Sequence, residues 1–144
     1  MTNYMSDRCF VDSNVLVYAH DRSTGVKHER AQNLLGQLWQ DGSGVLSTQV
    51  LQEVCVNLRR KALKPLSIEE VRAIVQDYLA WEVVTNSQES ILQALDTERR
   101  FRISFWDALV VQAAEGSGCE ILYSEDLNHG QVFDSVRVVN PFRD

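Results

Sequence analysis

The sequence predicts a three-layer α/β fold with a mainly parallel central sheet, formed by a single domain over residues 1–144. Short apolar runs alternate with longer amphipathic segments, which is the pattern of strands joined by crossover helices. The length is that of one domain able to bury a sizeable core, and the chain contains no repeat, linker or low-complexity segment. The expected strands are residues 8–11, 45–46, 82–84, 120–123 and 136–139.

The first strand leads directly into a helical turn, because Asp12, Ser13 and Asn14 follow it with turn and cap chemistry. In a parallel sheet Asp12 lies at the carboxyl end of its strand, where open α/β folds place their ligands. The alternative is that Asp12 only caps the helix. The run at 120–123 repeats the motif, since a polar loop with Asp126 follows it directly.

Helices are expected over residues 26–39, 48–63, 67–81, 90–100 and 104–114. Gly42 and Gly44 separate the first helix from the second strand, and Pro65 ends the second helix. Glu53 lies at the edge of the apolar stripe of that second helix. A glutamate at such an edge most often reaches into solvent, but it is also where a helix can lend a carboxylate to a cleft.

The helix that begins near Ser104 is apolar on all sides after Asp107, apart from Gln112, so it is expected to be buried. A carboxylate at its start therefore needs a partner, because an unpaired buried charge is costly. Ser104 and Asp107 fit a capping box, which provides a purely local partner. The alternative is a shared site with other acids of the chain.

The net charge of -6 argues against a protein that coats nucleic acid through a broad basic surface. Clusters of Lys and Arg are read first as solvated helix ends and second as phosphate contacts. Members of these clusters are Arg59, Arg60, Lys61, Lys64, Arg99, Arg100 and Arg102. No signal-peptide or membrane-spanning run is present, which predicts a cytoplasmic protein. The three cysteines and three histidines show no ligand spacing, so a His/Cys metal centre is not expected.

Four acids thus occupy notable places: Asp12, Glu53, Asp107 and Asp126. Gathered at the carboxyl edge of one sheet they would repel one another, so the arrangement requires a cation among them. Oxygen ligands without His or Cys select a hard ion, Mg²⁺ or Mn²⁺. Such an ion usually serves phosphate chemistry.

The same four segments resemble the four-acid pattern of PIN-domain ribonucleases, and most closely the VapC-type toxins of toxin–antitoxin pairs. The matching segments are Phe10-Val11-Asp12-Ser13-Asn14-Val15-Leu16, Leu51-Gln52-Glu53-Val54, Phe105-Trp106-Asp107-Ala108 and Leu122-Tyr123-Ser124-Glu125-Asp126. The resemblance runs from Phe10 to about Phe142, with the motifs in the family's order and spacing. No single motif is specific, but four in order are informative.

The resemblance implies a compact α/β/α fold and metal-dependent cleavage of RNA, with Asp12, Glu53, Asp107 and Asp126 as metal-binding acids. Ser124 matches a hydroxyl residue beside the last acid. Two departures are that Asn14 stands near Asp12 without a second acid, and that Glu125 stands where many relatives carry a basic residue.

The resemblance also implies a homodimer that binds a small antitoxin protein. An apolar helix face around Val71, Ile74, Val75 and Leu79 is one candidate surface, although burial in the core is commoner. Candidates for guiding the RNA backbone are Arg59, Arg60, Arg99 and Arg102.

Two other classes of protein share some of these features. Phosphatases of the haloacid-dehalogenase type and response-regulator receivers also place an acid after the opening strand, but they use a lysine from a late strand. This chain has no lysine after Lys64. A PIN-like scaffold that only binds a protein or RNA partner would be favoured by loss of the acids, and all four are present. The sequence therefore favours the nuclease.

Overall fold

A computed structural model describes residues 8–60 and 64–144, and it contains the predicted α/β architecture. Within these residues, six strands form one sheet in the order β3-β2-β1-β4-β6-β5. The strands are β1 (Cys9–Val11), β2 (Gly44–Ser47), β3 (Glu82–Val84), β4 (Ile121–Tyr123), β5 (Val132–Phe133) and β6 (Val136–Val139). All neighbouring strands are parallel except β5 and β6, which form an antiparallel pair.

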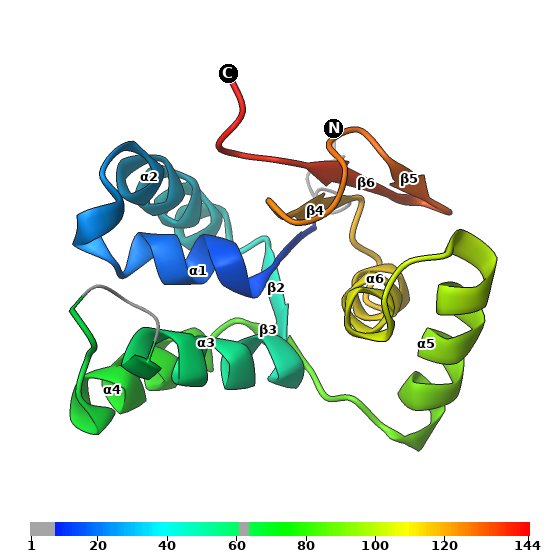
Figure 1. The fold of residues 1–144 in the computed structure, drawn as a ribbon, viewed down its shortest axis with the longest axis horizontal. Helices are drawn as coiled ribbons and strands as arrows, with labels where there is room; N and C mark the ends of the chain where they lie inside the picture. The colour runs from blue at the N-terminus through cyan, green and yellow to red at the C-terminus, as the bar shows by residue number, and fades with distance from the viewer. Residues whose placement is uncertain (1–7, 61–63) are drawn as a thin grey trace.

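Helices cover both faces of the sheet, with α1 to α4 on one side and α5 and α6 on the other (Figure 1). They are α1 (Ser13–Ala19), α2 (Val26–Asp41), α3 (Thr48–Arg60), α4 (Ile68–Tyr78), α5 (Gln88–Phe101) and α6 (Phe105–Gly116), with a short 3₁₀ turn, η2 (Arg22–Thr24). This confirms the three-layer prediction. Within the described residues, no helix is both long and apolar enough to cross a membrane.

The predicted elements are confirmed with small shifts of their ends, and β5 and η2 are additions. β5 has only two residues, too few for an alternating pattern to reveal it. The predicted end of α3 near Leu63 lies outside the described residues. The apolar positions Ile91, Leu92 and Leu95 of α5 lie on its solvent side, where each is about half exposed or more, while Ser90 and Ala94 are buried.

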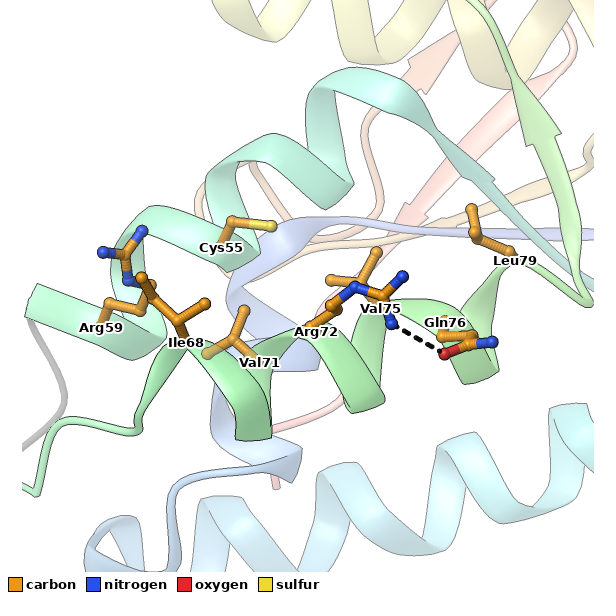
Figure 2. Close-up of a pocket in the computed structure, with 8 residues that line it drawn as sticks. All are labelled: Cys55, Arg59, Ile68, Val71, Arg72, Val75, Gln76 and Leu79. Atoms are coloured by element: carbon orange, nitrogen blue, oxygen red, sulfur yellow. Dashed lines mark hydrogen bonds between the residues drawn. The ribbon is translucent and has the colours of Figure 1, made fainter.

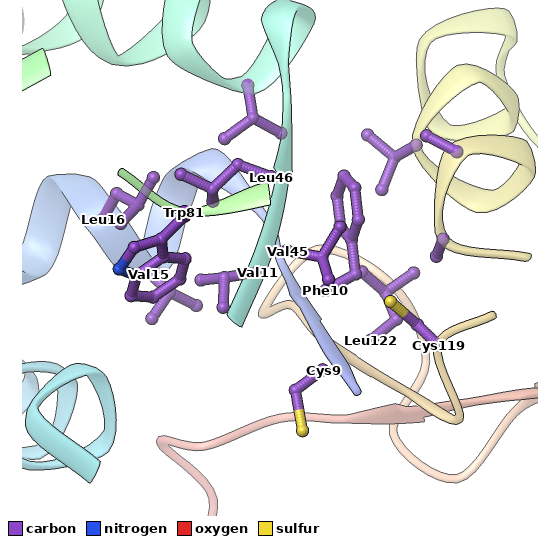
Figure 3. Close-up of a cluster of buried hydrophobic side chains, with 14 of the residues drawn as sticks. Cys9, Phe10, Val11, Val15, Leu16, Val45, Leu46, Trp81, Cys119 and Leu122 are labelled. Atoms are coloured by element: carbon purple, nitrogen blue, oxygen red, sulfur yellow. The ribbon is translucent and has the colours of Figure 1, made fainter. Parts of the chain in front are cut away.

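The strand at the centre of the fold, β1, is buried on both faces. Phe10 and Val11 are fully buried and point to opposite sides of the strand (Figure 3). Val11 lies on the side of Val15 and Leu16 from α1, and Phe10 lies on the side of Leu122 and α6. A strand covered on both faces needs apolar residues at consecutive positions, which explains the run Cys9-Phe10-Val11.

Two glycines allow the chain to pass from α2 into β2. Gly42 ends α2 with a φ of 67°, a left-handed conformation that glycine adopts without steric cost. Gly44 lies under the ring of Trp81, which occupies the space that a Cβ atom would need. Any side chain at Gly44 would displace this indole, so we attribute the glycine to packing.

The order of the strands determines where a ligand can bind. The chain leaves β1 for β2 and β3 on one side, and only later adds β4 on the other side of β1. The connections therefore diverge between β1 and β4, so the carboxyl ends of these two strands form the switch point at which open α/β sheets bind their ligands. Asp12 and Ser124 are the first residues after them.

Candidate active site

Asp12 is the buried centre of the candidate site. It follows β1, caps α1 by accepting the Ser13 backbone N–H at 2.8 Å, and is 5% exposed. Because Val11 is in register with Tyr123, the next residues of both strands meet. The fully buried Ser124 hydroxyl consequently donates a 2.8 Å hydrogen bond to Asp12 Oδ2. Asp12 is thus both a helix cap and part of a shared polar site.

Asn14 connects Asp12 with Asp126 through its side-chain amide. Asn14 Nδ2 donates to Asp12 Oδ2 at 3.4 Å and to Asp126 Oδ2 at 3.2 Å. Its Oδ1 accepts the Glu125 backbone N–H at 3.2 Å. Asn14 therefore lies between the two carboxylates as a neutral hydrogen-bond donor.

Glu53 and Asp107 approach the same edge of the sheet from α3 and α6. The starts of these two helices are joined by Gln49, whose Nε2 donates to the Trp106 carbonyl oxygen at 3.3 Å. Glu53 and Asp107 are both partly exposed. Four acids that are far apart in the sequence thus face one region of the fold.

The prediction that Asp107 starts in a dry environment is wrong, although most of α6 after it is buried. The first turn of α6 emerges from the core, and the neighbouring Trp106 is 63% exposed. Ser104 Oγ accepts the Asp107 backbone N–H at 3.1 Å, so Ser104 does cap the helix. In these two described residues, the Asp107 carboxylate does not accept the Ser104 backbone N–H, which is the second hydrogen bond of a capping box. The acid that lacks water is Asp12.

The electrostatics of the site show uncompensated negative charge. The pKa of Asp12 is raised to about 6, chiefly because the carboxylate is buried. Hydrogen bonds from Ser124 and Ser13 oppose this rise, and the charges of Glu53 and Asp126 add to it. Burial likewise raises the pKa of Glu53, hydrogen bonds from Ser13 and Gln49 lower it, and the charges of Asp107 and Asp126 raise it. The four acids therefore form one interacting group.

The donors of this group fit a hard divalent cation by their chemistry, because all are carboxylate oxygens. Within residues 8–60 and 64–144 none of the four acids forms an ion pair with Lys, Arg or His. In the same residues, no three His, Cys, Asp or Glu side chains are grouped closely enough to hold a metal ion as they stand.

The arginines proposed as RNA contacts form no ion pair with the four acids in the described parts of the chain. Arg99 pairs with Asp96 on its own helix at 3.5 Å. Arg59 and Arg60 lie in the last turn of α3, and Arg102 ends α5 with a left-handed φ of 56°. Their role in RNA binding stays a prediction.

Sequence reasoning missed two features that hold the site together. Glu125 accepts a hydrogen bond from the Tyr18 hydroxyl at 2.7 Å and forms an ion pair with Lys27. Gln49 is buried and joins α3 to α6, while its Oε1 has no partner among the residues that the structure describes. No local pattern signals either feature, since Lys27 and Glu125 are 98 residues apart.

Two hollows lie near these elements. One of about 400 Å³ borders Glu53 and is lined by Gln49, Gln52, Glu53, Val56, Asn57 and Trp106. The other, of about 430 Å³, lies between α3 and α4 (Figure 2). Its lining is Cys55, Arg59, Ile68, Val71, Arg72, Val75, Gln76 and Leu79, so it contains most of the apolar helix face singled out in the sequence.

Solved structures with a similar fold include a toxin and a toxin–antitoxin complex. VapC20 of Mycobacterium tuberculosis, described as a toxin that cleaves the sarcin–ricin loop, is 20% identical with a TM-score of 0.65, over 82% of this chain and 89% of that one. A toxin–antitoxin complex from Klebsiella pneumoniae is 16% identical with a TM-score of 0.68, over 92% and 97%. DNA-bound VapBC from Salmonella typhimurium is 13% identical with a TM-score of 0.64, over 91% and 96%. At these identities the likeness concerns the fold.

A comparison with curated protein sequences gives no match. The profile of the PIN domain family, in contrast, matches residues 9–134, which include β1, the helices α1 to α6 and all four acids. The chain therefore belongs to the PIN domain family.

Proposed function

We propose that the protein is a Mg²⁺- or Mn²⁺-dependent endoribonuclease, and the toxin of a toxin–antitoxin pair. The observation that carries this proposal is the buried Asp12, whose neighbours Glu53 and Asp126 are acids and which has no cationic partner in the described residues. An acidic group of this kind at a sheet switch point is expected to bind a cation that in turn binds phosphate. Membership of the PIN domain family and the toxin folds support the same conclusion.

In this proposal Asp12, Asp107 and Asp126 hold the ion, and Glu53 completes the site or positions water. A bound ion would supply an activated water and neutralise charge on the phosphoryl oxygens. Ser124 and Asn14 orient the Asp12 and Asp126 carboxylates through the hydrogen bonds described above. The hollow beside Glu53 and Trp106 gives an unpaired RNA strand access to Glu53.

The test is RNA cleavage by the purified protein with Mg²⁺, with Mn²⁺ and with EDTA. We expect cleavage with either ion, none in EDTA, and none by Asp126→Asn. Asp96→Asn is the matched control, because Asp96 is an exposed acid on α5 that pairs with Arg99. Equal cleavage in EDTA, or by Asp126→Asn, would rule out the metal mechanism.

We further propose that a small antitoxin binds the groove between α3 and α4. Val71, Val75 and Leu79 form its apolar floor, and Arg59 and Arg72 add positive charge without an ion-pair partner in the described residues. Figure 2 shows Arg72 bonded to the neutral Gln76, at 3.4 Å. The groove therefore suits an amphipathic antitoxin helix with apolar and acidic residues. Val75→Lys should abolish binding of the proposed antitoxin, whereas Val26→Lys, at an exposed position of α2, should not.

The homodimer is also part of the proposal. Ile91, Leu92 and Leu95 form an exposed apolar row on α5, and within the described residues they do not pack against the main core cluster. A row of this kind is a candidate for contact with a second copy of the chain.

The alternative function is a PIN-like scaffold that binds RNA or protein without cleaving it. The observation in its favour is that the acids do not form a ready-made three-ligand cluster in the described residues. A scaffold would bind RNA in EDTA and in Mg²⁺ alike, and would leave the RNA intact in both.

A further inference from the structure

Glu125 stands between Ser124 and Asp126 in the sequence, yet its carboxylate belongs to a different set of contacts. The Tyr18 hydroxyl donates to Glu125 Oε1 at 2.7 Å, and Lys27 Nζ contacts Oε2 as an ion pair. Lys27 Nζ also reaches the Tyr18 oxygen at 3.4 Å. The Glu125 carboxylate is thus already neutralised, on the side of α1 and α2.

The lysine that neutralises Glu125 is held in a defined place. Lys27 Nζ lies 4.9 Å from the centre of the Tyr18 ring and 5.7 Å from that of Phe142. The two rings contact each other edge to face, with centroids 4.9 Å apart. Cation–π contacts and a hydrogen-bonded ion pair restrict a lysine far more than solvent does. This cluster joins α1, α2 and the C-terminal segment to the loop after β4.

The backbone of residues 124–126 is fixed at the same place. The Glu125 N–H donates to Asn14 Oδ1 at 3.2 Å, and the Asp126 N–H donates to Ser124 Oγ at 3.1 Å. The Asp126 side chain itself is exposed, and it accepts a hydrogen bond from Asn14 at 3.2 Å. Because an amide contact holds an exposed carboxylate only weakly, the position of this carboxylate follows from the backbone that carries it.

We propose that Lys27 and Glu125 are positioning residues for Asp126: their ion pair fastens the loop after β4 to α2 and so sets where the Asp126 carboxylate stands relative to Asp12. This inference rests on the proposed function, in which both acids bind a cation. It also explains how a glutamate can stand beside a metal-binding acid without joining the site. Residues that orient metal ligands in this indirect way commonly change metal affinity by about 10- to 100-fold.

Two other roles for the pair predict different effects of these substitutions on Mn²⁺ binding. If Lys27 and Glu125 acted only through their charges, Lys27→Met would leave more negative charge near the site and tighten Mn²⁺ binding, and Glu125→Gln would weaken it. If Lys27 contacted RNA phosphate, Lys27→Met would raise the KM for RNA and leave Mn²⁺ binding unchanged. Positioning predicts that both substitutions weaken Mn²⁺ binding. The double variant should then bind Mn²⁺ no more weakly than the single variant with the lower affinity, because the two residues act as one unit.

The experiment compares Lys27→Met, Glu125→Gln, the double variant and Lys27→Arg with wild type. Mn²⁺ binding is measured by calorimetry, and amide hydrogen exchange of residues 124–130 is measured in EDTA. We expect Mn²⁺ binding about tenfold weaker in the first three and near wild type in Lys27→Arg, which keeps the ion pair. In the first three, the Glu125 and Asp126 amides should also exchange faster.

Arg8→Met and Glu82→Gln are the matched controls, because Arg8 and Glu82 form an ion pair at the opposite, amino end of the sheet. Neither should change Mn²⁺ binding or exchange at 124–130. Shifts of opposite sign for Lys27→Met and Glu125→Gln, or unchanged exchange in both, would overturn the positioning role. Amide exchange is measured without metal or RNA, so it tests the positioning role independently of the proposed function. A wild-type protein that binds no Mn²⁺ would refute the proposed function alone.

Discussion

The Ser124 hydroxyl donates a 2.8 Å hydrogen bond to Asp12 across the carboxyl ends of two adjacent parallel strands, and both residues are buried. This bond gives the buried carboxylate a donor that water cannot easily replace. The contact connects residues 112 positions apart in the sequence. It therefore links the stability of the fold to the chemistry of the site.

Ser124→Ala should destabilise the protein by about 1–3 kcal/mol at pH 8, because a buried carboxylate loses a donor. The deficit should be smaller at pH 4.5, where folded Asp12 is protonated and neutral. Urea unfolding in EDTA at both pH values measures it. Ser117→Ala is the control, because the Ser117 hydroxyl donates to the Ala113 carbonyl at 2.7 Å and its loss should cost the same at both pH values. Equal deficits for Ser124→Ala at the two pH values would contradict the prediction.

Asp12 should make the metal-free protein less stable as the pH rises from about 4 to about 6. Its pKa is raised from 3.8 to about 6 in the fold, so over this window the folded state keeps a proton that the unfolded state has released. A tenfold difference in proton affinity between the two states corresponds to about 1.4 kcal/mol, so the full penalty above pH 6 is about 3 kcal/mol.

Asp12→Asn should remove this slope while keeping the helix cap, since asparagine caps helices as well as aspartate does. The measurement is the difference in unfolding free energy between the variant and wild type from pH 4 to pH 8 in EDTA. The variant should gain relative to wild type as the pH rises. A constant difference across the range would show that Asp12 has no raised pKa.

Asp107→Asn should stabilise the protein by about 0.5–1 kcal/mol in EDTA, because it relieves repulsion with Glu53 at a partly exposed site. With the proposed metal site, added Mg²⁺ should reverse the order, since wild type would bind the ion more tightly and gain more from it. Thermal melts in both conditions measure the change. Glu89→Gln, in the first turn of α5, is the control and should be slightly destabilising in both. If Asp107→Asn lowered the stability by the same amount with and without Mg²⁺, Asp107 would act only as an acid at the start of a helix.

Leu92→Lys should convert the proposed dimer to a monomer without loss of stability, because Leu92 is 63% exposed in the single chain. A charge placed at the centre of an apolar contact opposes association. Sedimentation at micromolar concentration measures the change, and Val26→Lys, 64% exposed on α2, is the control. A wild-type protein that sediments as a monomer would refute the dimer itself.

Most of the fold could be predicted from the sequence because its elements have strong local signals. The run Cys9-Phe10-Val11 before Asp12 indicated a buried strand and a helix cap, and both are confirmed. The two-residue β5 and the exposed side of α5 could not be predicted, since apolar spacing on a helix does not tell which neighbours cover it.

The candidate site was predictable in its acids but not in its environment. Asp12, Glu53, Asp107 and Asp126 each stand at a strand exit, a stripe edge or a helix start, which are local features. Burial is a property of the assembled fold. The sequence therefore predicted that Asp107 is shielded from water, whereas the shielded acid is Asp12. The pair of Lys27 and Glu125 depends on contacts 98 residues apart and has no local signature.

The strand order also has a consequence for the timing of synthesis. β1, β2 and β3 are neighbours formed by the first part of the chain, but β4 joins β1 only after α6 has been made. A nascent chain still attached to the ribosome can therefore assemble the half of the sheet that holds Asp12 while Asp126 is not yet available to it. Long-range closure of this kind is slow compared with helix formation. The candidate site of the nascent chain is therefore incomplete until translation is nearly finished.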